Sequence, residues 1–197
     1  LHGTKDLVVS FDGFSVFLSD KQKPKNWLHI DQHPNNSMYS IQGAYNFLPV
    51  NENSSGFVVV PKSHLKMIDT DRKGDWVPVE NETGFVKLII PENCLVLWNS
   101  RTIHANTGMD KRTLLDKSND LDRLTCYITY MPKSTRPPNV LLQKMIAYVK
   151  GEGTSHWANR CELKKYPWGF GPGYESKHFN SIKPDASHIP KERFDVF

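Results

Sequence analysis

Cysteine is scarce in this chain of 197 residues, which has three, at positions 94, 126 and 161. Their odd number and the lack of a Cys-x-x-Cys spacing argue against a disulfide framework. Two of them lie inside apolar runs, so we expect buried free thiols. Free thiols are typical of a reducing compartment, and we therefore expect a cytoplasmic protein rather than a secreted one.

Long hydrophobic runs and a strong charge of one sign are also missing. No stretch approaches the roughly 18 consecutive apolar residues that a membrane-spanning helix needs. The 25 basic and 21 acidic residues leave a net charge of +4, and the basic residues are scattered. That charge favours attraction to anions but makes no concentrated nucleic-acid footprint. The chain contains no internal repeat and no low-complexity tract.

The composition that remains is that of an ordinary globular protein, with 38% hydrophobic and 11% aromatic residues. Its length fits one domain, and we expect residues 1–197 to form it. The chain begins at Leu1 without a methionine, which is compatible with truncation or processing. A missing N-terminal segment could hold further strands.

Short strand patterns separated by turn residues follow one another along residues 7–133, and helical periodicity is almost absent there. This succession predicts an all-β sandwich or barrel. Asp12-Gly13, between the first two strands, is a typical hairpin dipeptide. The expected strands are 7–11, 14–18, 27–32, 38–48, 57–60, 85–90, 94–98 and 121–131.

Residues 134–197 differ from this core and predict a helical and irregular C-terminal extension. Leu141, Met145 and Val149 recur at helical spacing, behind Pro137-Pro138 and ahead of Gly151. This predicts a helix over 140–150 whose apolar stripe covers a sheet. A second short helix is expected over 155–165, followed by a tail rich in proline, glycine and aromatic residues.

One strand carries a pair of metal-ligand side chains. In Trp27-Leu28-His29-Ile30-Asp31-Gln32, the alternation of a strand puts His29 and Asp31 on one face and Ile30 on the other. Joined by an imidazole from a distant strand, they would form a 2-His-1-carboxylate triad, which leaves three positions open on a non-haem Fe(II). His104, which follows the apolar strand 94–98, is our candidate for that third ligand.

The order of several motifs resembles the phytanoyl-CoA dioxygenase-like family. The matching motifs are Trp27-x-His29-x-Asp31-Gln32, residues 43–49, Val60-Pro61-Lys62-Ser63-His64, the stretch 98–106 with His104, and Arg123 on a strand. The match covers roughly residues 7–133. The resemblance implies a double-stranded β-helix, a jelly-roll of cupin type, and a dioxygenase that uses Fe(II), 2-oxoglutarate and O2.

The same resemblance implies roles for individual residues. His29, Asp31 and His104 would bind the iron and form the catalytic centre. The open positions would take 2-oxoglutarate and O2, and a ferryl species would abstract hydrogen from the substrate and return hydroxyl. Related halogenases lack the carboxylate, so Asp31 favours hydroxylation or another oxygenation.

Two arginines compete to bind the far carboxylate of 2-oxoglutarate. Arg112 is nearer to His104 in sequence but lies in the polar stretch 108–122. Arg123 begins an alternation in which Arg123, Thr125, Tyr127 and Thr129 share one strand face. We choose Arg123, because a strand-held guanidinium offers two parallel hydrogen bonds and the hydroxyl of Thr125 can add another.

The remaining polar candidates have an equally ordinary explanation. Gln42 and Tyr39 could line the co-substrate pocket, yet a half-buried polar strand face also explains them. Gln32, Arg101 and Asn106 are candidate substrate contacts, or residues that fix the loops around the metal ligands.

The main hypothesis is an oxygenase that hydroxylates a small molecule or lipid-derived metabolite. Alternatives are an oxygenase acting on a nucleic acid or protein, a cupin-type isomerase, an O2-using enzyme without 2-oxoglutarate, and a non-enzymatic cupin-like binding module with a relic metal site. Substrate specificity resides in loops on a shared scaffold, so the sequence leaves the substrate and the oligomeric state open.

Overall fold

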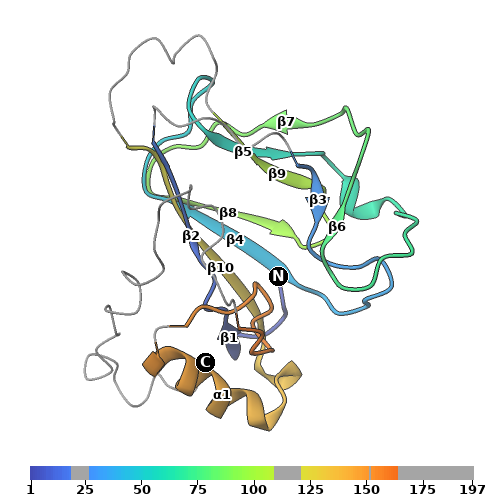
Figure 1. Ribbon diagram of the computed structural model, residues 1–197, viewed down its shortest axis with the longest axis vertical. Helices are drawn as coiled ribbons and strands as arrows, with labels where there is room; N and C mark the ends of the chain where they lie inside the picture. The colour runs from blue at the N-terminus through green and yellow to red at the C-terminus, as the bar shows by residue number, and fades with distance from the viewer. Residues whose placement is uncertain (19–26, 109–120, 151, 164–197) are drawn as a thin grey trace, which may run out of the picture. The chain divides into compact units, whose positions relative to one another are not determined.

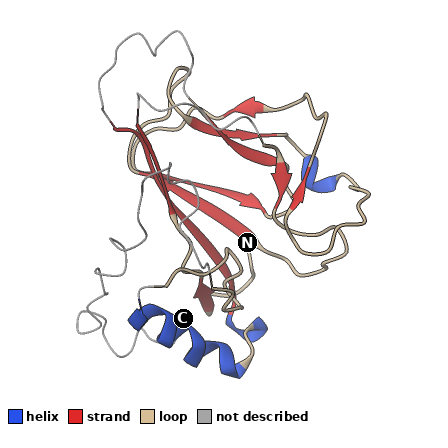
Figure 2. Ribbon diagram, in the orientation of Figure 1, coloured by secondary structure: helices blue, strands red, loops and turns tan. Residues whose placement is uncertain are grey.

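The computed structural model describes residues 1–18, 27–108, 121–150 and 152–163. The chain divides into two compact units, one formed by Phe14–Tyr127 and the other by Leu1–Gly13 with Ile128–Phe197. Strands predominate, and the described residues contain one α-helix, towards the C-terminal end (Figure 2). The expected mainly β fold with a C-terminal helix is therefore confirmed, while the single domain over 1–197 stays a prediction. Among the described residues, no helix combines the length and apolar character needed to cross a membrane.

The larger unit contains two sheets, drawn as separate layers in Figure 1. In the first sheet the strand order is β2 (Phe14–Leu18), β10 (Leu121–Pro132), β4 (Ile41–Asn46) and β8 (Cys94–Asn99). In the second it is β6 (Val77–Pro78), β3 (His29–Ile30), β9 (His104–Thr107), β5 (Gly56–Val59) and β7 (Val86–Lys87). Early and late strands thus alternate within each sheet, which is the strand order of a jelly-roll.

The apolar side chains on the outward face of the second sheet fix its register. Seven apolar side chains on that face form one buried cluster: Leu28, Ile30, Val58, Val60, Val77, Ile103 and Ala105. Because successive strand residues point to opposite faces, burying Ile30 and Ile103 turns His29 and His104 to the inner face. A slip of one residue would exchange the two sets, so the apolar cluster orients the site.

The inner faces of the two sheets pack through aromatic residues. Phe57 on β5 and Trp98 on β8 lie with ring centroids 4.7 Å apart, and Ala44 on β4 joins them in a buried cluster. These side chains fill the part of the barrel next to His104, whose ring centroid lies 5.5 Å from that of Phe57 and 5.3 Å from that of Trp98.

Several expected elements differ in the structure. The strands on either side of Asp12-Gly13 form, but each pairs with β10 instead of with the other. At 12 residues, β10 is long enough to pair with both. The strand expected over 85–90 is limited to β7 and an isolated bridge between Val50 and Ile90. No helix forms over the described part of 155–165, where Thr154 bridges to Leu163. The cysteines are free as expected, but half-buried rather than buried.

The smaller unit packs a helix against a short strand. Here β1 (Leu7–Val9) pairs with the end of β10, and α1 (Pro138–Lys150) follows the 3-10 turn η3 (Lys133–Thr135). The buried face of α1 carries Val140, Lys144 and Ala147. The predicted apolar stripe is therefore wrong in its position, because Val149 at its end is 58% exposed.

Lys144 explains why this face can hold a polar residue. Its side chain is fully buried, its Nζ donates to the carbonyls of Val9 and Ala158 at 2.5 Å each, and it lies 5.3 Å from the ring centroid of Phe11. Loss of hydration on burial lowers the pKa of Lys144 to about 8. The ammonium therefore ties the helix, the first strand and the 157–160 turn together.

Replacing Lys144 with alanine should lower the free energy of unfolding by about 2–4 kcal/mol, because two buried carbonyls lose their donor and the side-chain stem leaves a void. Lys150→Ala, at the exposed end of α1, is the control and should stay within about 0.5 kcal/mol of wild type. Chemical denaturation measures both, and equal effects would contradict the bracing role.

The folded-state pKa of Lys144 lies below the unfolded value of 10.5, so the cost of burying its charge is complete below pH 8 and declines above it. Wild type should therefore gain stability relative to Lys144→Met as the pH rises from 8 to 10.

Candidate metal centre

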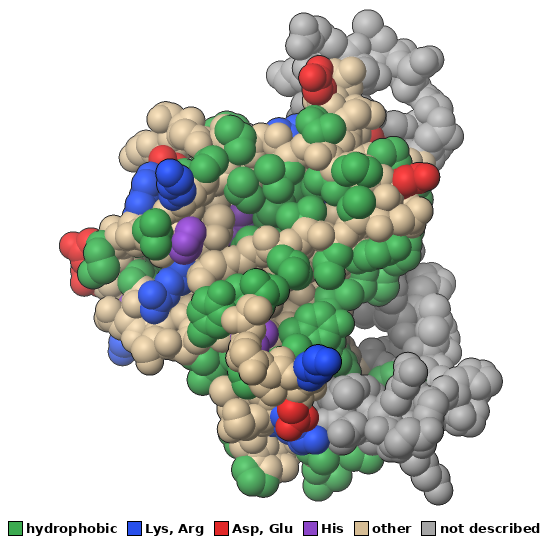
Figure 3. Space-filling view, turned by 180° about the vertical axis from the view of Figure 1, so that it is seen from behind, with side chains coloured by type: hydrophobic (Ala, Val, Ile, Leu, Met, Phe, Trp, Pro, Cys, Tyr) green, Lys and Arg blue, Asp and Glu red, His purple; other side chains and the backbone are tan. Residues whose placement is uncertain are grey.

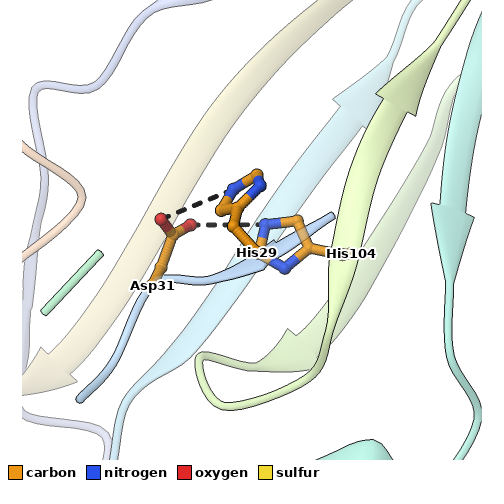
Figure 4. Close-up of side chains that lie close together, drawn as sticks. All are labelled: His29, Asp31 and His104. Carbon is orange, nitrogen blue, oxygen red and sulfur yellow. Dashed lines mark ion pairs between the residues drawn. The ribbon is translucent and has the colours of Figure 1, made fainter. Parts of the chain in front are cut away.

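The three predicted ligands meet on the inner face of the second sheet. Strands β3 and β9 pair with His29 directly opposite His104. The backbone N–H of Asp31 donates to the carbonyl of Ser100 at 3.1 Å, which continues the contact beyond the short strand. Asp31 therefore lies beside both imidazoles, as Figure 4 shows.

Each histidine is held in the tautomer that a metal ligand requires. The Nδ1 of His29 lies 2.8 Å from the carbonyl of Trp27, and the Nδ1 of His104 lies 2.8 Å from the carbonyl of Thr102. A carbonyl oxygen can only accept, so a neutral ring carries its proton on Nδ1. The lone pair is then on Nε2, and both Nε2 atoms face Asp31.

The carboxylate of Asp31 completes the cluster. Its Oδ1 lies 3.6 Å from Nε2 of His29 and its Oδ2 lies 3.3 Å from Nε2 of His104. One ligand atom from each residue lies within 4.8 Å of the others. Gln42 on β4 donates from Nε2 to Oδ2 of Asp31 at 2.9 Å. Two neutral imidazoles and one carboxylate on a single buried face fit a divalent transition metal.

Arg123 forms a second feature of the barrel interior. The side chain is 1% exposed and lies on the inward face of β10. Its Nε donates to Thr125 Oγ1 at 2.9 Å, and its Nη1 donates to the carbonyl of Gly56 and to Asn106 Oδ1, both at 2.8 Å. Within the described part of the chain, Nη2 is buried without a hydrogen-bond partner. Burial lowers the pKa of Arg123 from its ordinary value, since the charged form loses hydration.

An unpaired buried guanidinium N–H is costly and is normally satisfied. Among the described residues, no carboxylate forms an ion pair with Arg123. The surrounding polar groups, Thr125, Asn46, Asn106 and Tyr127, hold one edge of the guanidinium through a connected set of hydrogen bonds. The other edge carries Nη2, which has no hydrogen-bond partner among the described residues.

Asn106 links this cation to the metal-ligand cluster. It lies two residues after His104 on β9, on the same face, and accepts from both Nη1 of Arg123 and the hydroxyl of Tyr127, the latter at 3.0 Å. Two residues along a strand span about 7 Å. The triad and the cation therefore lie at neighbouring positions within one polar interior.

The other predicted site residues lie in several different surroundings. Gln32 and Arg101 brace the turn after β3: Nε2 of Gln32 donates to the carbonyls of Asn36 and Met38, and Nη2 of Arg101 donates to those of Pro34 and Asn36. Tyr39 is 49% exposed. Arg112 lies outside the described residues. Substrate and co-substrate roles for Gln32, Arg101, Asn106, Gln42 and Tyr39 stay predictions.

Sequence patterns missed the aromatic surroundings of the histidines. Trp27 stacks on His29 with ring centroids 4.5 Å apart and planes 17° apart, and Trp76 lies 5.7 Å from His29. Trp27 could have been found, since it shares the alternation of His29 and Asp31. Trp76 gives no local signal, because only the pairing of β3 with β6 brings it near.

A cavity of about 260 Å³ opens on the side of Phe57 and Trp98, between the two sheets. Its other apolar walls come from Val59, Leu88 and Val96, and its rim includes Lys62 and His64. On the face shown in Figure 3, apolar side chains cover a broad area, and a histidine lies beside basic side chains at its edge.

No family model matches the sequence, and no curated protein matches it. Solved structures with partial similarity include the epimerase SnoN in complex with Fe3+, alpha ketoglutarate and nogalamycin RO, at 15% identity and a TM-score of 0.45, covering 64% of this chain and 50% of that one. EvdO2 from Micromonospora carbonacea var. aurantiaca, complexed with 2-oxoglutarate, is 14% identical with a TM-score of 0.45, covering 65% of this chain and 53% of that one. EctD from S. alaskensis, with 2-oxoglutarate and 5-hydroxyectoine, is 13% identical with a TM-score of 0.43, covering 66% of this chain and 46% of that one. The chain spans about half the length of these structures.

Proposed function

We propose that this chain is an Fe(II)- and 2-oxoglutarate-dependent oxygenase that hydroxylates a small organic molecule. The observation that carries the proposal is the pairing of a His-Asp-His cluster with a buried guanidinium, Arg123, whose Nη2 has no partner among the described residues. A set of three metal-ligand side chains alone suits many reactions. The buried guanidinium of Arg123, which donates to Asn106 on the strand of His104, adds a place for the far carboxylate of a keto diacid.

The donor atoms of these residues suit both iron and 2-oxoglutarate. His29 and His104 would bind iron through Nε2, because Nδ1 of each ring is engaged by a backbone carbonyl. Asp31 would supply the negative ligand, and Gln42 keeps its carboxylate from rotating. Three ligands on one side leave the opposite positions to co-substrate and O2.

When bound, iron and 2-oxoglutarate supply the activation of O2 that oxidises a C–H bond, and the protein supplies binding and orientation. Arg123 would hold the far carboxylate through Nη2, while Thr125 and Asn106 fix the plane of its guanidinium. Phe57 and Trp98 pack beside the ring of His104. The phytanoyl-CoA dioxygenase-like family and the hydroxylation itself remain part of the proposal.

The proposal is tested by anaerobic titration of 2-oxoglutarate into protein loaded with Fe(II), watching for the weak visible metal-to-ligand charge-transfer band. We expect a saturable band that needs both components. Protein loaded with Zn(II) is the control and should give none, since a d10 ion has no such transition. Bound iron without a band would remove 2-oxoglutarate from the proposal, and folded protein that binds no iron would favour the relic binding module.

A further inference from the structure

Two half-exposed tryptophans lie at the metal centre. Trp27 is 46% exposed and Trp76 is 42% exposed. Single exposed apolar residues are common on protein surfaces, but a contiguous apolar patch beside a reactive centre indicates a binding surface. We call this pair the aromatic wall.

Ring contacts place both indoles beside a ligand histidine. Trp27 lies two residues before His29 and stacks on its ring. Trp76 directly precedes β6, which pairs with β3, and its ring centroid lies 5.7 Å from that of His29. The indole ring centroids of Trp27 and Trp76 lie 6.2 Å apart.

The wall is held in place by its neighbours. Trp27 stacks on the ring of His29, and its carbonyl accepts the Nδ1–H of that same residue. Trp76 stands between the buried Val77 and Asp75, whose Oδ1 accepts from the amide of Asn36 at 2.8 Å and from the backbone N–H of His33 at 3.3 Å. Little ordering entropy would be lost when a ligand packs on it.

The shape of the wall selects among ligand classes. The two indole planes differ by 35°, so they form one broad surface rather than a box closing around a cation. The side chains of Asn36, Asp75 and Arg101 form hydrogen bonds that hold the turn after β3. A broad aromatic surface suits a flat, weakly polar ring.

We propose that the substrate carries a flat aromatic or conjugated ring system that stacks on Trp27 and Trp76 and so presents its reacting carbon to the metal. This inference rests on the proposed function for the identity of the reaction, but the ring site itself exists without metal. Stacking sets which substrates bind and how they lie, so both tryptophans are specificity-determining residues.

The test uses two neutral probes of similar size, 2-naphthol and decahydro-2-naphthol, with ligand-observed NMR to measure affinity. The aromatic probe should bind about 2- to 10-fold more tightly than the saturated one. Trp76→Leu should weaken 2-naphthol binding by roughly 5- to 100-fold, and Trp76→Phe should restore much of it. Phe14→Leu, which removes a 63% exposed ring on β2, is the matched control and should have no effect.

Position is tested by loading the protein with Mn(II), which should broaden the resonances of bound 2-naphthol, whereas Zn(II) should not. Equal affinity for the two probes, no loss in Trp76→Leu, or binding without broadening in Mn(II)-loaded protein would each overturn the proposal. The Fe(II) and 2-oxoglutarate titration reports on the proposed function separately. Ring binding with no charge-transfer band would remove the oxygenase and leave the ring site.

Discussion

Replacing Asp31 with alanine is expected to abolish iron-dependent turnover and to leave the fold intact. Asp31 supplies the one negatively charged ligand, and its side chain, 14% exposed, packs in no apolar cluster. Its loss should weaken Fe(II) binding by more than the roughly 10- to 100-fold that is typical when a hydrogen-bond partner of a metal ligand is removed. Equilibrium dialysis with Fe(II) under anaerobic conditions measures the affinity, and the melting temperature of metal-free protein checks the fold.

Two further variants sharpen this result. Asp31→Asn keeps the size of the side chain but not its charge, so it should resemble the alanine variant in iron affinity. His33→Ala removes a histidine close to the cluster whose Nε2 lies 3.1 Å from the carbonyl of Arg72, and it should bind Fe(II) like wild type. Wild-type affinity in Asp31→Ala would show that the triad is assigned wrongly.

Replacing Arg123 with methionine should weaken binding of 2-oxoglutarate by about 2–4 kcal/mol, or roughly 30- to 1,000-fold, with Fe(II) binding retained. The guanidinium is buried, so its charge-assisted hydrogen bonds to a carboxylate are not screened by water. The anaerobic charge-transfer band, titrated with 2-oxoglutarate, measures the change directly.

Because Arg123 also binds Gly56 and Asn106, the methionine variant could lose stability as well as affinity. Arg123→Lys keeps the charge without the planar fork, and it should fold and still bind 2-oxoglutarate several-fold more weakly than wild type. Arg112→Met is the matched control, since the sequence offers that residue as the competing anchor. Loss of binding in Arg112→Met but not in Arg123→Met would reverse the assignment.

The sequence alone was enough to predict the ligand face. Period-2 alternation puts His29 and Asp31 together and Ile30 opposite, whichever strands lie beside them. The same alternation separates the polar set of Arg123, Thr125 and Tyr127 from its apolar neighbours, and the structure buries Arg123 and Thr125 and half-buries Tyr127. These predictions were reliable because they depend on the local geometry of one strand.

What the sequence by itself determined, then, was the kind of fold and the shared face of His29 and Asp31, because both follow from residues close together in the chain. Only the tertiary structure decided which strands pair, and pairing is set by burial of distant apolar residues such as Val58, Val77 and Ile103. That long-range pairing put His104 opposite His29, brought Asn106 to Arg123 and placed Trp76 at the metal centre. It also buried Lys144 instead of the expected apolar stripe, because two unpaired carbonyls needed a donor there.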